Sequence, residues 1–329
     1  MSPTYKQSCK VNPVALDFSA FEKKDIREEQ FAHEELYDAG ITKKQGELLR
    51  KAASWARGLK NSKALVVVAA VAVIGGVVLS MALAGLGGII AGFILLIPLI
   101  YLALYVLGWV EEAKRRIQLK WLLFAKQNGF KYHVSLVGYN NPEALAFQIG
   151  YGGEVSNVLE IDDRLSVAEY TYKTKIGEEE VSHHFNFARF DLQNNVPHLV
   201  LDSKFSALQI VGEQEISLEG NFQDYFTLYT QEGFHIDALQ IFTPDVMSKL
   251  LDQEGKYDLE LVGSDLYIYE MHQGLIESGL TVGILANETK DKERHSRFIN
   301  FLSSVIEIAS EIDEQTNRYI RTGRPDANQ

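Results

Sequence analysis

Histidine and acidic side chains within predicted strands are the residues of this sequence best suited to chemistry. His183 and His198 lie in two neighbouring β-rich runs, and Asp202 follows His198 by four positions. Imidazole nitrogens and carboxylate oxygens are the ligands that zinc and similar cations accept in catalytic sites. We therefore consider His183, His198 and Asp202 as candidate metal ligands, which would make a membrane-bound, metal-dependent hydrolase one alternative function.

Structural roles in the sheet or on the surface explain these histidines better than metal binding does. His183 and His184 are adjacent on a predicted strand, so their side chains point to opposite faces and suit a shared metal ion poorly. The sequence has no GxSxG, phosphate-loop or HExxH motif, and its single cysteine, Cys9, cannot form a CxxC site. We expect no cofactor, and a binding protein is favoured over an enzyme.

A second group of polar residues suits recognition of another protein. Asn221, Asp224 and Tyr225 lie in one polar-aromatic segment, and His198 lies in the predicted strand before it. Together these four residues form a candidate partner surface. The alternative is that the aromatic residues between Phe222 and Phe242 simply build the core of the domain.

The elements that position these residues begin with an apolar block. From Ala64 to Val110 the chain carries no acidic, basic or histidine side chain over 47 residues. A bilayer core about 30 Å thick is crossed by about 20 helical residues, so this stretch is more than twice as long as one crossing requires. We predict a transmembrane hairpin with spans near residues 64–84 and 89–110 and a glycine-rich turn at residues 85–88.

Small residues recur within the predicted spans at a spacing of four. Such spacing lets helix backbones approach closely in lipid, although glycine and alanine are also common there for general reasons. The candidate packing residues are Ala72, Gly76, Ala84, Gly88 and Gly92. Neither span has an ionisable residue of the kind that marks transport paths, which leaves a small oligomeric channel as a further alternative.

Flanking charges predict how the hairpin is oriented. Lysine and arginine side chains stay on the cytosolic side of a membrane, and the predicted turn has no charge to oppose them. The flanking cations are Lys51, Arg57, Lys60 and Lys63 before the first span and Lys114, Arg115, Arg116 and Lys120 after the second. We expect a multi-pass protein of the cell (inner) membrane with both termini in the cytosol.

The charge of the distal part limits its partners. Residues 127–329 carry 15 basic and 33 acidic residues, whereas residues 1–126 carry 17 and 11. Binding to phosphate backbones requires clustered lysine and arginine, so nucleic acid is excluded as a partner. The expected partners are the lipid bilayer, through the apolar block, and another protein or further copies of this chain.

The remaining patterns predict an α+β fold with four parts. These are an N-terminal helical segment (residues 1–60), the transmembrane hairpin with a juxtamembrane helix (61–128), a cytosolic α+β domain with an antiparallel or mixed sheet (129–320), and a polar tail (321–329). A helix is predicted from Ser19 to about Asp38. Later helices are predicted over Pro244–Asp252 and Lys292–Tyr319, the last packing on the sheet.

Short β-rich runs fill the distal part, and several alternate apolar and polar residues. The predicted strands are Phe130–Val137, Asn157–Ile161, Ala168–Lys175, Val181–Leu192, His198–Leu201, Gln209–Leu218, Phe226–Tyr229, Ala238–Phe242, Tyr257–Val262, Asp265–Tyr269 and Leu280–Ile284. The runs on either side of residues 177–180 predict a hairpin with an acidic tip.

Two segments, Leu218–Phe226 and Ala238–Met247, resemble an uncharacterised bacterial family of membrane proteins known as a domain of unknown function (three-one-three-seven). Members are similar in having a membrane hairpin followed by a domain with a Tyr-rich hairpin and a Pro-His-Leu segment. Here Tyr170–Tyr172 and Pro197–Leu201 match those features, and the resemblance covers roughly residues 45–275. It implies a membrane protein, with an envelope-related role, and carries over no catalytic residue.

The leading hypothesis is a membrane-anchored binding or scaffold module. An elaborate acidic domain without a catalytic motif, attached to an anchor without transport chemistry, suits recruitment of a protein partner at the cytosolic face.

Overall fold

The computed structural model describes residues 12–41, 111–270 and 288–322, apart from residues 24, 25, 113, 207, 209 and 219. The chain divides into two compact units. One contains residues 1–24, 120–277 and 287–329, and the other contains residues 25–119 and 278–286. The predicted transmembrane spans and their packing residues lie outside the described residues. Among the helices that are described, none is long and apolar enough to cross a bilayer.

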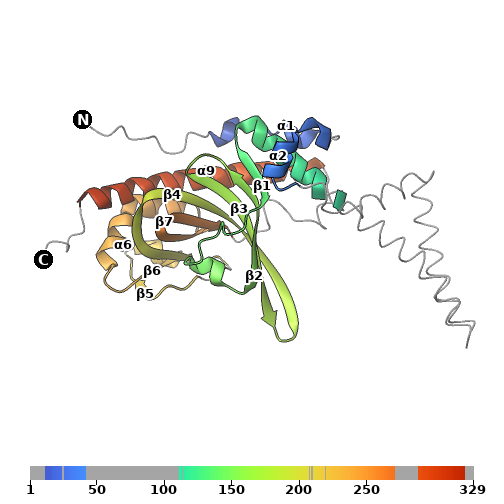
Figure 1. Ribbon diagram of the computed structural model, residues 1–329. Coiled ribbons are helices and arrows are strands. Elements are labelled where there is room, and N and C mark those ends of the chain that lie inside the picture. Colours follow the sequence, from blue (N-terminus) through green and yellow to red (C-terminus); the bar gives the residue numbers. More distant parts are fainter. Residues whose placement is uncertain are drawn as a thin grey trace, which may run out of the picture. The chain divides into compact units, whose positions relative to one another are not determined.

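A seven-stranded antiparallel sheet forms the first unit, together with a long C-terminal helix (Figure 1). The α+β class and the C-terminal helix are therefore confirmed, and the sheet, predicted to be antiparallel or mixed, is antiparallel. The strand order is β1-β2-β3-β4-β6-β5, and β7 pairs with β4. The strands are β1 (Lys131–Ser135), β2 (Tyr151–Glu160), β3 (Leu165–Ile176), β4 (Glu179–Ser203), β5 (Gln214–Ile216), β6 (Phe226–Thr230) and β7 (Asp258–Glu270).

Strand β4 is the centre of the sheet and bends along its length. It pairs with β3 in its first half, with β6 in its second half and with β7 through both. The ladder with β7 shifts register between Asp191 and Leu199, where Gln193 has a positive φ of 62°. Such irregularities bend a strand without ending it. The two strands predicted over Val181–Leu192 and His198–Leu201 are therefore one.

Strand β7 follows the same bend, with Gly263 at a positive φ of 62°. The runs predicted separately as Tyr257–Val262 and Asp265–Tyr269 form this one strand. The hairpin between β3 and β4 has its predicted acidic tip, because Ile176 pairs with Glu179 across a tight turn at Gly177.

Helices α6 (His235–Ile241), α7 (Pro244–Asp252) and α9 (Glu288–Thr322) pack together, and α9 runs along the sheet beside β4 (Figure 1). The strand predicted over Ala238–Phe242 is wrong, since most of this segment belongs to α6. Its buried side chains, Ala238, Ile241 and Phe242, follow the helical spacing of three and four rather than the alternation of a strand. The predictions for α7 and α9 hold.

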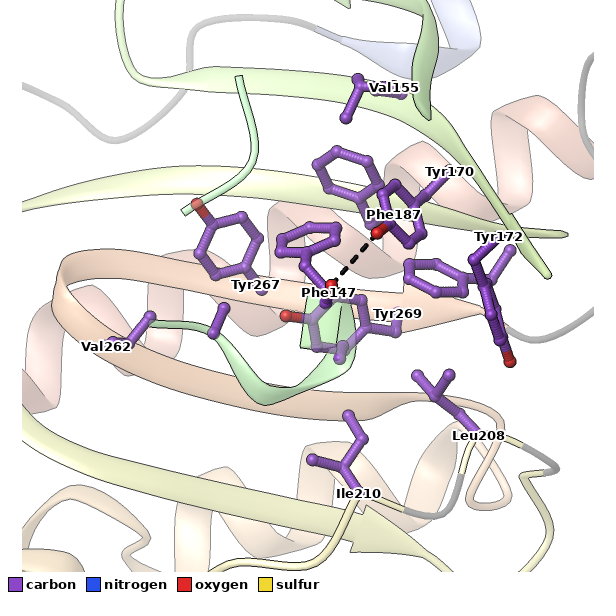
Figure 2. Close-up of a cluster of buried hydrophobic side chains, with 14 of the residues drawn as sticks. Phe147, Val155, Tyr170, Tyr172, Phe187, Leu208, Ile210, Val262, Tyr267 and Tyr269 are labelled. Carbon is purple, nitrogen blue, oxygen red and sulfur yellow. Dashed lines mark hydrogen bonds between the residues drawn. The ribbon is translucent and has the colours of Figure 1, made fainter. Parts of the chain in front are cut away.

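The other face of the sheet carries an aromatic core (Figure 2). Phe147 projects from the short 3-10 helix η3 (Leu145–Gln148) into rings supplied by β3, β4 and β7. The Tyr170 hydroxyl donates a hydrogen bond of 3.1 Å to the carbonyl of Phe147. The ring contacts of Phe147 and this hydrogen bond therefore anchor η3 on the sheet. The pocket of the candidate site lies beside η3.

The N-terminal segment differs from its prediction. Helix α1 (Ser19–Glu22) ends after four residues because Lys23 is extended, and Ser19 makes no side-chain cap. Separate short elements follow as η2 (Glu28–Gln30) and α2 (His33–Asp38). Earlier in the chain, η1 (Pro13–Ala15) and Phe18 belong to the first unit, where Phe18 contacts Phe124 of the helix over residues 114–128 and Phe298 of α9.

Candidate functional site

A buried carboxylate lies at the centre of the candidate site. Glu260 is on β7, opposite Val200 of β4, and its side chain is 0% exposed. Its oxygens accept backbone N–H groups from Leu145 at 2.7 Å and Ala146 at 3.4 Å, and the Tyr269 hydroxyl at 3.0 Å. Together with an imidazole these donors supply what an ionised carboxylate requires in the interior. The anchoring of η3 beside the sheet positions two of them.

His198 provides the fourth partner of this carboxylate. It lies two residues before Val200 on β4, so both side chains share the face of the sheet that Glu260 occupies. Its Nε2 lies 2.7 Å from Glu260 Oε1, and its side chain is 20% exposed. Because an ionised carboxylate can only accept, Nε2 is the donor in this contact, and in the neutral form of the ring Nδ1 is then an acceptor. Among the described residues Nδ1 has no partner.

A pocket of about 190 Å³ opens beside this imidazole. Its walls come from η3, β4, the end of β6 and the segment before β5. The lining residues are Leu145, His198, Val200, Val211, Gly212, Glu213, Tyr229, Thr230 and Gln231. Val211 stands at the rim with 66% of its surface exposed. We refer to this cavity as the His198 pocket.

Gly212 sets the position of one wall. A Cβ at this residue would lie 2.4 Å from Cβ of Tyr229, which is too close for any side chain. The segment over residues 211–213 therefore rests directly on Tyr229 because residue 212 is glycine. Thr230 does not add a nucleophile opposite His198. It pairs with Leu199 across the β4–β6 ladder, so its side chain points to the other face of the sheet.

Further carboxylates lie on the same face near the pocket. Asp258 precedes Glu260 by two residues and accepts the N–H of Ser203 at 2.7 Å. Burial raises the pKa of Asp258 to about 7, against hydrogen bonds from Ser206 and Ser203, and the nearby Asp202 adds to the rise. Burial also raises the pKa of Asp202, which accepts the N–H of Ile210 at 2.9 Å. The surroundings of the pocket are acidic.

The structure separates the candidate metal ligands. His183 stacks on Tyr172 and lies 2.7 Å from the Thr174 hydroxyl, whereas His198 is bonded to Glu260 and Asp202 to a backbone N–H. Within the described part of the chain, no three histidine, cysteine or acidic side chains form a group that could hold a metal ion.

The candidate partner surface is also divided. Asn221 and Asp224 lie in the short helix η4 (Gly220–Asp224), next to Tyr225, whose ring contacts that of Phe205. This segment joins β6 at Phe226, which pairs with Ser203, five residues along β4 from His198. At about 3.3 Å per residue, the two ends of the predicted surface are roughly 16 Å apart. His198 belongs to the pocket, and the other three residues do not.

A larger polar cleft of about 430 Å³ lies at another place on the first unit, where Lys131, Arg164, Arg189 and several acidic residues meet. Its cations already have carboxylate partners. Arg164 binds Asp313 with two hydrogen bonds, and Arg189 binds Asp265 at 3.0 Å. Because these arginines are already paired with carboxylates, few of their N–H donors are left for a ligand. The His198 pocket is therefore the better candidate for a binding site.

Sequence reasoning missed Glu260, Tyr269 and Glu213. A signal for the first was present, since Asp258 and Glu260 alternate with Leu259 and Leu261 in a run that otherwise predicts a buried strand. Charged side chains are rarely buried without partners, so such a run indicates a polar site inside the fold.

Comparison with protein-family models, curated proteins and solved structures finds no match to the chain. The resemblance to the bacterial membrane-protein family stays a prediction.

Proposed function

We propose that this chain is a membrane-tethered binding module that recruits a protein partner through the His198 pocket. The supporting observation is an imidazole that lines a small open pocket and is held by a fully buried carboxylate. The four donors keep the buried carboxylate paired, and the carboxylate in turn holds the imidazole in one orientation at the pocket.

The size of the pocket favours a protein partner over a free metabolite. Sites for drug-sized ligands usually have volumes of about 300–1,000 Å³. At about 190 Å³ the His198 pocket suits one inserted side chain. Protein interfaces commonly gain most of their binding energy from a few anchor residues seated in such pockets. The exposed Val211 at the rim would extend the contact beyond the anchor.

The tether in this proposal is the uncharged stretch of residues 64–110, which is too long for one crossing and is flanked by cations on both sides. A returning hairpin would hold the acidic domain at the cytosolic face of the inner membrane. The family resemblance supports the same placement and an envelope-related role.

Site-specific photo-crosslinking in cells tests the recruitment. A photoreactive phenylalanine analogue replaces Val211 in the full-length chain, and matched chains carry it at the exposed Val137 or Leu239 instead. We expect one discrete adduct from position 211 whose cross-linked peptide mass spectrometry identifies, and whose yield falls at least fivefold with Gly212→Ala. Adducts of equal yield from all three positions would overturn the proposal.

Hydrolysis is the alternative function, because a carboxylate-oriented imidazole is also the arrangement of a general base. A panel of nitrophenyl esters and phosphates, assayed with the wild type and His198→Gln, separates the two functions. The binding proposal expects no difference between the two proteins. Robust turnover that disappears with His198→Gln would replace it with an enzyme.

A further inference from the structure

The open nitrogen of His198 selects for a hydrogen-bond donor. Nε2 donates to Glu260, and the three further donors to this carboxylate are Leu145, Ala146 and Tyr269. His198 lines the pocket, and in its neutral form the proton on Nε2 leaves a lone pair on Nδ1. A ligand group that only accepts hydrogen bonds, such as a carboxylate or a phosphate, finds no donor on this form of the ring.

The charge around the pocket is negative. Glu213 is an exposed lining residue, Glu215 follows it on β5, and neither has an ion-pair partner among the described residues. Burial raises the pKa of the Tyr229 hydroxyl, and the nearby Asp202 and Glu215 raise it further. No lysine or arginine belongs to the described residues that line the cavity. These groups attract a cation.

The remaining walls suit a hydrocarbon stem. Leu145, Val200 and Val211 line the pocket with aliphatic side chains, and Tyr229 adds an aromatic ring. A lysine side chain has a stem of four methylenes and a compact ammonium with three donors. Its stem loses water against apolar walls while its head reaches acceptors, and an ammonium is also attracted to the face of a tyrosine ring.

The net negative charge of the whole distal part also favours a basic partner. Residues 127–329 have 33 acidic and 15 basic residues, so a basic segment would be steered towards this domain. Long-range attraction of this kind increases the rate of association and leaves the choice of anchor residue to the pocket.

We infer that the anchor seated in the His198 pocket is a lysine side chain from a basic segment of the partner protein. Its stem lies between Leu145, Val200 and Val211, and its ammonium donates to Nδ1 of His198 and to the carboxylate of Glu213. This inference rests on the proposed function and names the chemistry of its partner. Arginine fits less well because its planar fork requires paired acceptors, whereas these two acceptors belong to separate side chains.

Peptide titration of the full-length chain in detergent tests this recognition. The probes are five-residue peptides of glycine and serine with a central lysine, ε-acetyl-lysine, arginine or norleucine. Histidine labelled with carbon-13 at Cε1 reports on binding, and His198→Gln identifies the relevant signal. We expect the lysine peptide to shift this signal in a saturable way, and its affinity to exceed that of the acetylated peptide at least tenfold.

Two matched variants locate the charge that is recognised. Glu213→Gln removes the lining carboxylate, and Glu232→Gln removes an exposed carboxylate that does not line the pocket. We expect Glu213→Gln to weaken the lysine peptide about tenfold, as loss of a charge-assisted hydrogen bond does, and Glu232→Gln to change its affinity less than twofold. Equal effects of the two variants would mean general charge attraction and would overturn the inference.

The outcomes separate this inference from the proposed function. Equal binding of the norleucine and lysine peptides, with the His198 signal shifted by both, would reject lysine recognition and leave the pocket as a site for partner side chains. If no peptide shifts the signal while cross-linking from position 211 stays specific, lysine recognition is likewise rejected. Failure of the specific cross-link would reject the proposed function itself.

Discussion

His198 and Glu260 illustrate how a residue acquires its chemistry from a distant partner. The two are 62 positions apart in the chain and meet because β4 and β7 pair. Burial of Glu260 among four donors leaves the imidazole one free nitrogen and one orientation. The same histidine on a solvent-facing strand would rotate freely and offer either nitrogen.

A buried aspartate makes stability depend on pH. Burial raises the pKa of Asp258 to about 7 from its ordinary value of 3.8. Between these pH values the folded chain keeps a proton that the unfolded chain releases, so stability falls as pH rises and the full cost is reached above pH 7. We expect the wild type to lose about 3 kcal/mol from this group between pH 5 and pH 8.

The variant Asp258→Asn removes this contribution and can still accept the N–H of Ser203. Its melting temperature should therefore fall less steeply from pH 5 to pH 8 than that of the wild type. A slope remains, because burial also raises the pKa of Glu169 to about 7. The exposed Asp252→Asn serves as the control. Thermal melting followed by tryptophan fluorescence measures the effect, and parallel profiles for all three proteins would contradict it.

At the scale of elements, η3 and the sheet depend on each other. The ring of Phe147 lies 4.9 Å from that of Tyr170 and 5.4 Å from that of Tyr267, measured between ring centroids. The same short helix presents the Leu145 and Ala146 N–H groups to Glu260. The packing of the Phe147 ring among the other aromatic rings is shown in Figure 2. This packing positions the two N–H donors that η3 offers to Glu260.

Truncation of Phe147 tests this dependence. Phe147→Ala removes a ring that is 8% exposed, and such truncations usually cost about 3–5 kcal/mol. We expect a strongly lowered melting temperature and, in the folded fraction, a shifted His198 signal because η3 loses its anchor. Gln148→Ala, next to it on the surface, should have little effect on either measurement. A stability loss without any change in the His198 signal would show that the packing of Phe147 does not position the site.

The elements also show where local patterns suffice. Helix α7 was predicted with its observed bounds because Pro244 suits the first helical position and the apolar spacing is regular. For the segment just upstream of α7 the predicted strand is wrong, because the short apolar run of residues 238–242 fits either a strand or a buried helix. Packing of α6 against α9 decided between them.

At the scale of the molecule, the proposed tether predicts a topology. Replacing Cys9 with serine leaves a chain without cysteine, into which Arg50→Cys or Lys131→Cys is introduced. We expect both cysteines to react with an impermeant thiol reagent only after the membrane is opened, because both flank the hairpin on the cytosolic side. Reaction of one position from outside the intact cell would reject the two-span hairpin and the cytosolic placement of the domain.

The sequence by itself determined the α+β class, the hairpin between β3 and β4 and the C-terminal helix α9, and it left open whether the sheet is antiparallel or mixed. These features follow from local periodicity, because a helix or strand buries one face and its side chains repeat with its own period. The uncharged stretch of residues 64–110 is equally a property of the sequence, and it supports the tether without any knowledge of contacts.

Only the tertiary structure decided which polar residues meet. It joined two predicted strands into the bent β4, paired His198 with Glu260, and separated both from His183 and from Asn221, Asp224 and Tyr225. The physical reason is that strand pairing depends on register and on curvature, which arise from contacts between distant segments. Local patterns hold no information about such contacts, so the His198 pocket became visible only in the folded chain.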